Sequence, residues 1–361
     1  MLSGVEWGEY RIGDLFEVKG TLSFNKEALV SGDEYDYVTR TSQNQGILQT
    51  TAFVNKENLN EAGTWSLGLL QMDFFYRQRQ WYAGQFVRKV VFKGSLPNGS
   101  ISFFTTVLNA LKPKLLSVLV RDVNKTFLDS CVQLPTRDGK IDFMFMERFV
   151  AELKAQRVAE LKAYLAVTGL SDYTLTPEEQ QAIQHFQEGN LQWRDYRLGD
   201  LFGEATRGKR LKSDDRIAGS LPFVTAGEAE MGISAFIGNS VEVFPANTIT
   251  IDMFGSTKYR NYSYGADDHV AVVHTQALPK HAVCFITTAI HKVANAGAFH
   301  YGRNFYAKDA APLHISLLSK SGEPDYAQME TFIRAIEKLV IRDVVLYADR
   351  ELAATQQAIN Q

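Results

Sequence analysis

The sequence feature that most constrains the fold is an internal repeat that spans most of the 361 residues. The segment WGEYRIGDLF at residues 7–16 recurs as WRDYRLGDLF at residues 193–202, an offset of 186 residues. The same offset relates a second set of matches, in which Val38, Thr39, Gly46 and Ile47 correspond to Val224, Thr225, Gly232 and Ile233. Chance matches do not keep one register over such distances, so the chain contains two copies of one unit.

Each copy is predicted to end in a long amphipathic helix. Residues 141–168 and 325–361 carry apolar side chains at three-and-four spacing, with charged residues between them. Their lead-ins match at an offset of 183 residues, where Gly139, Asp142 and Phe149 correspond to Gly322, Asp325 and Phe332. At 1.5 Å per residue the first helix is roughly 40 Å long. Helices so long and so one-sided are expected to pair with each other.

The segments before these helices are predicted to be mixed α/β. Expected strands are FEV, YDYVTR, TAFV, QFVRKVVF and SCVQLP in the first copy, and LPFVTA, NTITIDMF, HVAVVH and AVCFITT in the second. Residues 103–120 favour a helix interrupted by Pro113. Thr176, Pro177 and Glu179 form a helix start for the short bridge between the copies.

The predicted fold class is therefore α/β (α+β), with two globular domains, long antiparallel helices and a pseudo-twofold repeat. The expected boundaries are 1–140, 141–192, 193–324 and 325–361, alternately globular and helical. Because both copies begin with the same element and end with the same helix, the first residues of the chain are expected to lie near its end.

Charge, cysteine content and hydropathy narrow the class of protein further. The net charge is only −3, but the globular segments are slightly basic, at +2 and +1, whereas the helical segments carry −4 and −2. Cys131 and Cys284 lie in apolar runs at non-equivalent places, which favours buried free thiols over a disulfide or metal site. No apolar run is long enough to span a bilayer, so a cytoplasmic location without a membrane partner is expected.

The chain lacks the motifs of a catalytic centre. There is no phosphate-binding glycine loop, nucleophile elbow, HExxH motif or zinc-ligand spacing. The segment ELK occurs at residues 152–154 and 160–162 and could be half of a nuclease motif, but both copies fall on the charged face of the first long helix. We expect no catalytic residue and no metal in this chain.

Basic, amide and aromatic side chains interleave in segments expected to be loops at the tips of the globular domains. Such side chains can bind guanine, adenine or phosphate. Arg40 and Arg260 are the favoured base-reading residues of the two domains. The full set of candidate DNA-binding residues is Arg40, Ser42, Gln43, Asn44, Arg77, Arg79, Trp81 and Tyr82 in the first domain, and Arg207, Lys209, Arg210, Lys212, Lys258, Tyr259, Arg260, Tyr262 and Arg303 in the second.

Two domains that open with W-x2-YR-[IL]-GDLF, each followed by a long helix, resemble the DNA specificity subunit of type I restriction-modification systems. The recognition subunit of related type IIB-like enzymes is similar in the same respects. This resemblance covers nearly the whole chain. It implies that each globular unit is a target recognition domain reading one half of a bipartite site on double-stranded DNA. The matched GDLF residues, 13–16 and 199–202, would then be scaffold.

The resemblance also implies partners. The paired helices would act as a spacer and dock DNA adenine methyltransferase subunits, two of them, and possibly a restriction or translocase subunit. Methylation and cleavage would belong to these partners, and S-adenosylmethionine would be bound by the methyltransferase and not by this chain. A helix of roughly 40 Å corresponds to about 12 base pairs, which would leave a gap of about 5 to 8 unread pairs between half-sites.

Two other classes remain possible on the sequence alone. One is a duplicated protein-interaction scaffold that never touches DNA, and the other is a nuclease or methyltransferase acting by itself. The missing catalytic and cofactor motifs oppose the enzyme, and the loops rich in arginine, tyrosine and asparagine oppose the pure scaffold.

Overall fold

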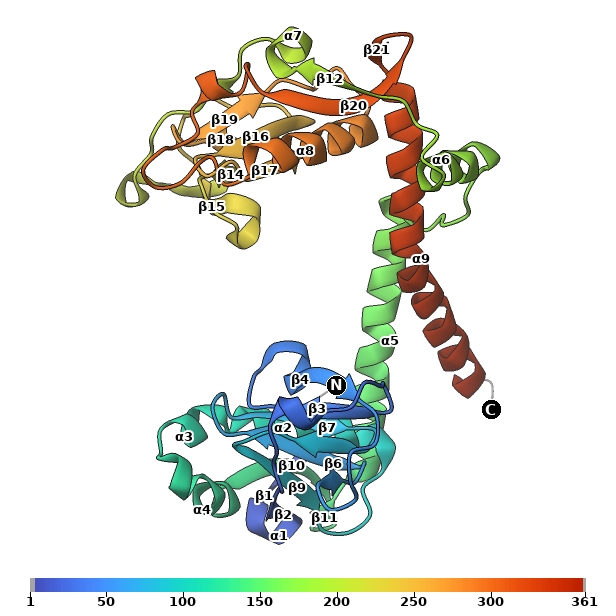
Figure 1. The fold of residues 1–361 in the computed structure, drawn as a ribbon. Helices are drawn as coiled ribbons and strands as arrows, with labels where there is room; N and C mark the ends of the chain where they lie inside the picture. Colours follow the sequence, from blue (N-terminus) through green and yellow to red (C-terminus); the bar gives the residue numbers. More distant parts are fainter. Residues whose placement is uncertain (1–3, 360–361) are drawn as a thin grey trace. The chain divides into compact units, whose positions relative to one another are not determined.

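The computed structural model describes residues 4–359, and side chains up to residue 354 (Figure 1). The chain divides into two compact units, residues 1–160 with 351–361, and residues 161–350. Residues 351–359 therefore belong to the same unit as residues 4–160. The predicted proximity of the first and last residues of the chain falls on residues 1–3 and 360–361, which lie outside the described residues. The predicted domain boundaries stay predictions, because the division between the units falls inside the two long helices.

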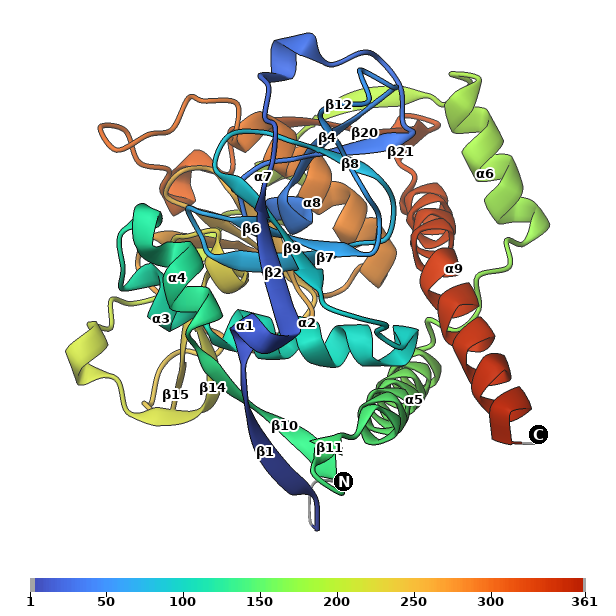
Figure 2. The ribbon, with the colours of Figure 1, turned by 90° about the horizontal axis from the view of Figure 1, so that it is seen from below.

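Each unit opens with the repeated element identified in the sequence. In the first unit it forms strand β1 (Glu6–Arg11) and helix α1 (Ile12–Leu15), and in the second β12 (Trp193–Arg197) and α7 (Leu198–Phe202). β1 pairs antiparallel with β10 (Cys131–Arg137), beside which it lies in Figures 1 and 2, and β12 pairs with β20 (His314–Lys320). Each partner strand then turns back into a short strand before its long helix: β11 (Lys140–Ile141) and β21 (Glu323–Pro324).

The Gly-Asp-Leu-Phe segment packs as scaffold in both units. A Cβ atom added to Gly13 would lie 2.8 Å from the carbonyl oxygen of Leu128, and one added to Gly199 would lie 2.9 Å from the Cβ of Ala311. Only glycine permits these close approaches. Phe16 is fully buried, and Phe202 packs against the core of the second unit.

The body of the first unit contains two four-stranded sheets and three helices. One sheet has the order β2-β9-β6-β7 and the other β4-β3-β8-β5. The core lies between the first sheet and the helices, around Phe16, Trp65, Phe104 and Phe127. The elements are β2 (Phe16–Gly20), β3 (Tyr35–Val38), β4 (Ile47–Thr51), β5 (Leu59–Asn60), β6 (Thr64–Gly68), β7 (Asp73–Arg77), β8 (Trp81–Ala83), β9 (Val87–Phe92), α2 (Ile101–Ala110), α3 (Lys112–Leu116) and α4 (Val123–Leu128).

The second unit repeats this plan. Its sheets have the orders β13-β19-β16-β17 and β15-β14-β18, so the β16–β17 hairpin corresponds to β6–β7 and the β14–β15 pair to β3–β4. The elements are β13 (Thr206–Arg207), β14 (Ala218–Val224), β15 (Ile233–Ile237), β16 (Thr248–Asp252), β17 (Thr257–Arg260), β18 (Gly265–Ala266), β19 (Val270–Val273) and α8 (Lys280–Ala294). Short 3-10 helices lie at η1 (Lys26–Ala28), η2 (Gln43–Gly46), η3 (Asn98–Ser100), η4 (Val120–Asp122), η5 (Ser213–Asp215), η6 (Ala229–Gly232) and η7 (Ala307–Asp309).

Three predictions about local structure are wrong. AVCFITT is not a strand but part of α8, because Ala282, Ile286 and Ile290 continue a helical stripe that packs against the sheet. TAFV contributes only Thr51 to a strand. Cys131 is exposed instead of buried, whereas Cys284 is half-buried and burial raises the pKa of its thiol. Both thiols are free, as predicted.

The two long helices form as predicted, as α5 (Phe143–Val167) and α9 (Tyr326–Ile359). They contact each other within each unit: Lys154 Nζ lies 2.6 Å from Glu351 Oε2 in the first, and Lys162 Nζ lies 3.0 Å from Asp349 Oδ1 in the second. The later residue of α5 meets the earlier residue of α9, as antiparallel helices require.

A short helix, α6 (Pro177–Gln187), lies beside α9 within the second unit (Figures 1 and 2). Thr176 and Glu179 form the predicted capping box at its start. Glu179 is buried and accepts a hydrogen bond from Lys338 of α9 at 3.0 Å, and the rings of Phe186 and Phe332 lie 4.8 Å apart. Among the described residues, no helix is both long and apolar enough to cross a membrane.

Candidate nucleic-acid interface

A loop of eight residues follows the same strand in each unit and carries the repeated Val-Thr and Gly-Ile residues at its ends. It runs from Thr39 to Gly46 after β3, and from Thr225 to Gly232 after β14. Each loop is closed by a backbone hydrogen bond from its first residue to its last, 2.8 Å in the first unit and 2.9 Å in the second. We call these segments the first and second tip loops.

Both tip loops have the same unusual backbone. Asn44 and Gln45 in the first, and Glu230 and Met231 in the second, have φ between 46° and 56°, and each pair is followed by a glycine with φ near 80°. Side chains other than glycine rarely adopt this left-handed region, because Cβ approaches the carbonyl oxygen. Two consecutive residues with this unfavourable backbone occur at the same place in both copies. The surrounding structure of each unit must therefore hold the loop in this conformation.

The side chains of the two loops differ at all six positions between the fixed ends. The first loop reads RTSQNQ at residues 40–45 and the second AGEAEM at residues 226–231. Arg40, Ser42, Gln43 and Asn44 are exposed on the first loop, as the sequence predicts, and the Arg40 guanidinium lies 5.1 Å above the ring of Phe86. Their contact with DNA stays a prediction.

The two favoured arginines differ in their surroundings, and one of them was placed wrongly. Arg260 does not lie in an exposed loop but at the end of β17, where its side chain is 1% exposed. Arg77 is buried at the equivalent end of β7, 183 residues earlier. A side chain so enclosed holds protein groups together instead of reaching a base edge. Burial lowers the pKa of the Arg77 guanidinium to about 10, although the charge of Asp36 opposes the shift.

Three other predicted DNA-binding residues are also buried, because they lie in strands of the sheets. Trp81 and Tyr82 of β8 are fully buried, and the Tyr82 hydroxyl accepts hydrogen bonds from the backbone of Val54 and Asn55. Lys258 of β17 is 7% exposed. The predicted surface role of these residues is corrected to a structural one. Tyr259 and Tyr262 are half-buried, and Tyr262 accepts a hydrogen bond from Arg260.

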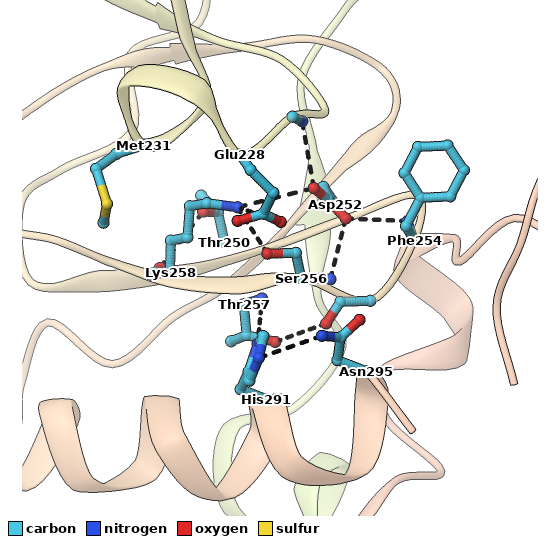
Figure 3. A network of polar contacts seen from close by, with 12 residues as sticks. Glu228, Met231, Thr250, Asp252, Phe254, Ser256, Thr257, Lys258, His291 and Asn295 are labelled. Atoms are coloured by element: carbon cyan, nitrogen blue, oxygen red, sulfur yellow. Dashed lines mark hydrogen bonds and ion pairs between the residues drawn. The ribbon is translucent and has the colours of Figure 1, made fainter. Parts of the chain in front are cut away.

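Lys258 is the centre of a polar network beside the second tip loop (Figure 3). Its Nζ donates to Ser256 Oγ at 2.7 Å and to Glu228 Oε1 of the loop at 3.4 Å, and it lies 3.8 Å from Asp252 Oδ2. Asp252 accepts from the backbone of Phe254 and Ser256, and also from Gly227 of the loop at 3.3 Å. The hydrogen bond with Ser256 and the charge of Lys258 lower the pKa of Glu228.

Basic side chains flank the second tip loop. Gly208 packs so closely on the backbone that an added Cβ would lie 1.6 Å from the carbonyl oxygen of Ala266, and Ala266 pairs with Val224 at the base of the loop. The segment around Gly208 exposes four of the predicted residues: Arg207, Lys209, Arg210 and Lys212. Arg303 is also exposed, 5.5 Å above the ring of Phe299.

In the first unit, an open groove of about 590 Å³ adjoins the tip loop. It is lined by Lys26, Arg40, Thr41, Gln71 and Gln85, among others. Arg79 is exposed but pairs with Asp36, to which its Nε donates at 2.9 Å. The groove itself contains cations and amides, the side chains that bind phosphates and bases, beside the acidic Glu27 and the apolar Leu48 and Leu70.

The residues of the second tip loop are not among the predicted DNA-binding residues, because none of them is basic or aromatic. Glu228, Glu230 and Met231 are exposed at the positions that correspond to Ser42, Asn44 and Gln45. A carboxylate can accept a hydrogen bond from cytosine N4, and an apolar side chain can contact a thymine methyl group. The signal was present in the repeat, because Val-Thr and Gly-Ile bracket both loops at one offset.

One group of potential metal ligands occurs among the described residues, formed by Asp267, Asp268 and His269. These are consecutive residues of the turn before β19, and His269 Nδ1 lies 3.4 Å from Asp268 Oδ1. Burial raises the pKa of Asp267. Consecutive residues of one turn are close to each other because of their position in the chain, so their proximity does not indicate a metal site.

Comparison with known proteins agrees with this architecture. Residues 4–163, from the first repeated element through most of α5, match the family described as type I restriction modification DNA specificity domain. The match identifies this segment as a DNA specificity domain, and the internal repeat places a second copy of the same unit after it. These matches support a role of the chain in DNA sequence recognition.

Two relatives resemble the chain over nearly its whole length. The type II restriction enzyme BgcI specificity subunit S.BcgI of Heyndrickxia coagulans is 23% identical over 349 residues, which cover 93% of this chain and 96% of that protein. The crystal structure of the S subunit of a type I restriction-modification system from M. genitalium has a TM-score of 0.61 and 14% identity, covering 99% of this chain and 94% of that one. The second comparison shows that the fold is shared.

Proposed function

We propose that each unit reads one half of a bipartite DNA site, with its tip loop facing the bases. One observation carries this proposal: the two tip loops share their length, closing hydrogen bond and strained backbone, yet differ in all six intervening residues. Two domains that recognise different DNA sequences are expected to share the backbone of the loop and to differ in its side chains.

The flanking cations support the proposal by supplying phosphate contacts. The exposed cations are Lys209, Arg210 and Lys212 in the segment that packs on β18, Lys26 in the groove of the first unit, and Arg40 in the first tip loop. Contacts to phosphate position a protein on DNA, whereas contacts to base edges give specificity. In the second loop, Glu230 and Met231 would then carry base recognition, and the basic segment would carry affinity.

The proposed partners are two DNA adenine methyltransferase subunits, with a restriction or translocase subunit in addition. S-adenosylmethionine would be bound by the methyltransferase, and the assembly would work in the cytoplasm, where its DNA is. The support within this chain is apolar surface on the helices: Val340, Val344 and Tyr347 of α9, and Val167 of α5, are exposed. The three side chains of α9 belong to the apolar stripe that the sequence shows, and a docked subunit would bury them together with Val167.

The division into half-sites is tested by sequencing the methylated sites of cells that carry the system with Arg40→Ala or with Glu230→Ala. We expect each change to relax base preference on one side of the site and to leave the other side unchanged. Arg137→Ala is a matched control, because Arg137 lies at the end of β10 and pairs with Asp142 instead of facing a tip loop. A continuous site, or a change in both half-sites from one substitution, would show that the two-reader arrangement is wrong.

A further inference from the structure

The two buried arginines have the same environment in both units. Arg77 stands opposite Thr64 in the β6–β7 hairpin, and Arg260 stands opposite Thr248 in the β16–β17 hairpin. Each Nε donates at 2.9 Å to a hydroxyl of the neighbouring strand, Ser66 Oγ or Thr250 Oγ1. A hydroxyl on that strand therefore fixes each guanidinium.

Each guanidinium also donates to the tip loop of its unit. Arg77 Nη2 donates to the carbonyl oxygen of Gln45 at 2.5 Å, and Arg260 Nη1 donates to the carbonyl oxygen of Met231 at 2.8 Å. Gln45 and Met231 are the second of the two strained residues in their loops. Each arginine thus donates a hydrogen bond to the carbonyl group of a residue whose left-handed backbone conformation is unfavourable.

A second attachment holds each loop to the turn of the same hairpin, with different residues in the two units. In the first unit, Ser42 Oγ donates to Asp73, which also pairs with Lys112 at 2.6 Å. In the second, Gly227 donates to Asp252, and Lys258 bridges to Glu228 (Figure 3). The hairpin turn thus holds the first part of each loop, and the arginine holds its end.

We propose that Arg77 and Arg260 are positioning residues for DNA sequence recognition, each setting the backbone shape in which its tip loop presents side chains to the bases. The inference rests on the proposed function. The strained turn needs an external partner because its own conformation is unfavourable, and a charged donor to a carbonyl is the strongest such partner in the surroundings. Without it, residues 43–45 or 229–231 sample several conformations, and base discrimination falls.

The decisive experiment replaces each arginine by methionine, which keeps a long side chain but removes the donors. The full-length variant is produced with the methyltransferase subunits with which it assembles, and methylation is sequenced over a library of degenerate sites. For Arg77→Met we expect non-cognate bases in one half-site to be accepted about tenfold more often, with the other half-site unchanged. Arg260→Met is expected to give the reciprocal result.

Milder variants separate positioning from folding. Ser66→Ala and Thr250→Val remove the hydroxyl that orients each guanidinium and keep the arginine, so they are expected to broaden the same half-site by a smaller factor. Trp65→Phe and Ile249→Val change residues that precede these positions on the same strands and pack in the hydrophobic cores of the two units. These controls are expected to lower thermal stability without altering base preference.

The outcomes are distinct. If the arginine variants and the hydroxyl variants leave base preference unaltered, as is expected of the controls, the positioning role is overturned and the two-reader proposal stands. If the arginine variants broaden both half-sites together, the positioning role is likewise overturned. Failure of the proposed function is seen separately, through Arg40→Ala and Glu230→Ala.

Discussion

At the scale of single residues, the glycine that ends each tip loop has two independent reasons to be glycine. Gly232 has φ of +80°, and an added Cβ would lie 2.9 Å from the carbonyl oxygen of Thr225 and 3.1 Å from that of Gly227. Gly46 has the same conformation, with the carbonyl oxygens of Thr39 and Thr41 at 3.1 and 3.3 Å. The left-handed turn can therefore close only on a residue without a side chain.

Gly232→Ala is expected to lower the free energy of unfolding by more than the roughly 1–2 kcal/mol that a left-handed alanine costs alone. Gly189→Ala provides the matched control, because Gly189 has φ of +71° and nothing within 4 Å of the added Cβ. Chemical denaturation of the two variants measures the difference. If both variants lost the same free energy of unfolding, the loop carbonyl groups would be able to move away from the added Cβ without an energetic penalty.

The buried arginines mark what the sequence could and could not reveal about the site. Arg77 and Arg260 stand out in the sequence as donors among aromatic residues, and the structure places both next to the tip loops. The pattern YRQRQWY looks like one polar loop, but only residues 78–80 form the connection, since Arg77 ends β7 and Trp81 begins β8. In the same way Arg260 ends β17. Burial follows from pairing with distant strands, which local sequence does not encode.

At the scale of elements, helix α6 depends on its first turn. Thr176 Oγ1 accepts from the backbone of Glu179 at 3.2 Å, and Glu179 Oε2 accepts from the backbone of Thr176 at 2.9 Å. Thr176→Ala removes the first of these bonds and is expected to cost about 1 kcal/mol in thermal or chemical denaturation. Thr331→Ala is the control, since the Thr331 hydroxyl only donates to the carbonyl of Ala327 inside α9. A cap variant as stable as this control would contradict the expectation.

The contact between α8 and α9 is expected to make stability depend on acidity. Burial raises the pKa of Glu337, but the hydrogen bond from His281 and the charges of Lys280 and His281 outweigh burial, so the pKa lies below its ordinary value of 4.5. A carboxyl group with a lowered pKa in the folded state contributes stability above its unfolded pKa and loses it as pH falls through the folded pKa.

Glu337→Gln is therefore expected to be less stable than the unmodified chain near neutral pH. The difference should shrink as pH falls below about 4.5, where the unfolded carboxyl group becomes protonated. Urea denaturation of both proteins between pH 7 and pH 3 measures it. A difference that stayed constant over this range would assign the effect of the substitution to packing and not to charge.

The sequence predicted the elements well where a pattern repeats and poorly where only tertiary packing decides. The 3.6-residue stripes of α5 and α9 and the cap of α6 are local signals, and the structure has all three helices. The AVCFITT segment is rich in residues that favour strands, yet it forms α8 because its helical face is covered by the sheet.

At the scale of the whole molecule, the charge distribution predicts how the chain binds DNA. The globular segments carry +2 and +1 and the helical segments −4 and −2, so few phosphates can be neutralised. Release of counterions provides most of the sequence-independent affinity. The isolated chain is expected to bind DNA weakly, above about 1 µM at physiological salt, and to weaken further as salt rises, while the assembly with methyltransferase binds tightly. Nanomolar binding by the chain alone in a salt titration would contradict this.

The fixed frame of the tip loops bears on how such a protein acquires a new target. Each loop has eight residues, a closing hydrogen bond and a buried arginine at its end, so its length is set while its six central side chains are free to vary. New specificities would then arise by substitution within a preformed turn and not by insertion. Because the two frames are separate, variants of one unit combine with variants of the other, and the repertoire of recognised sites grows as the product of the two sets.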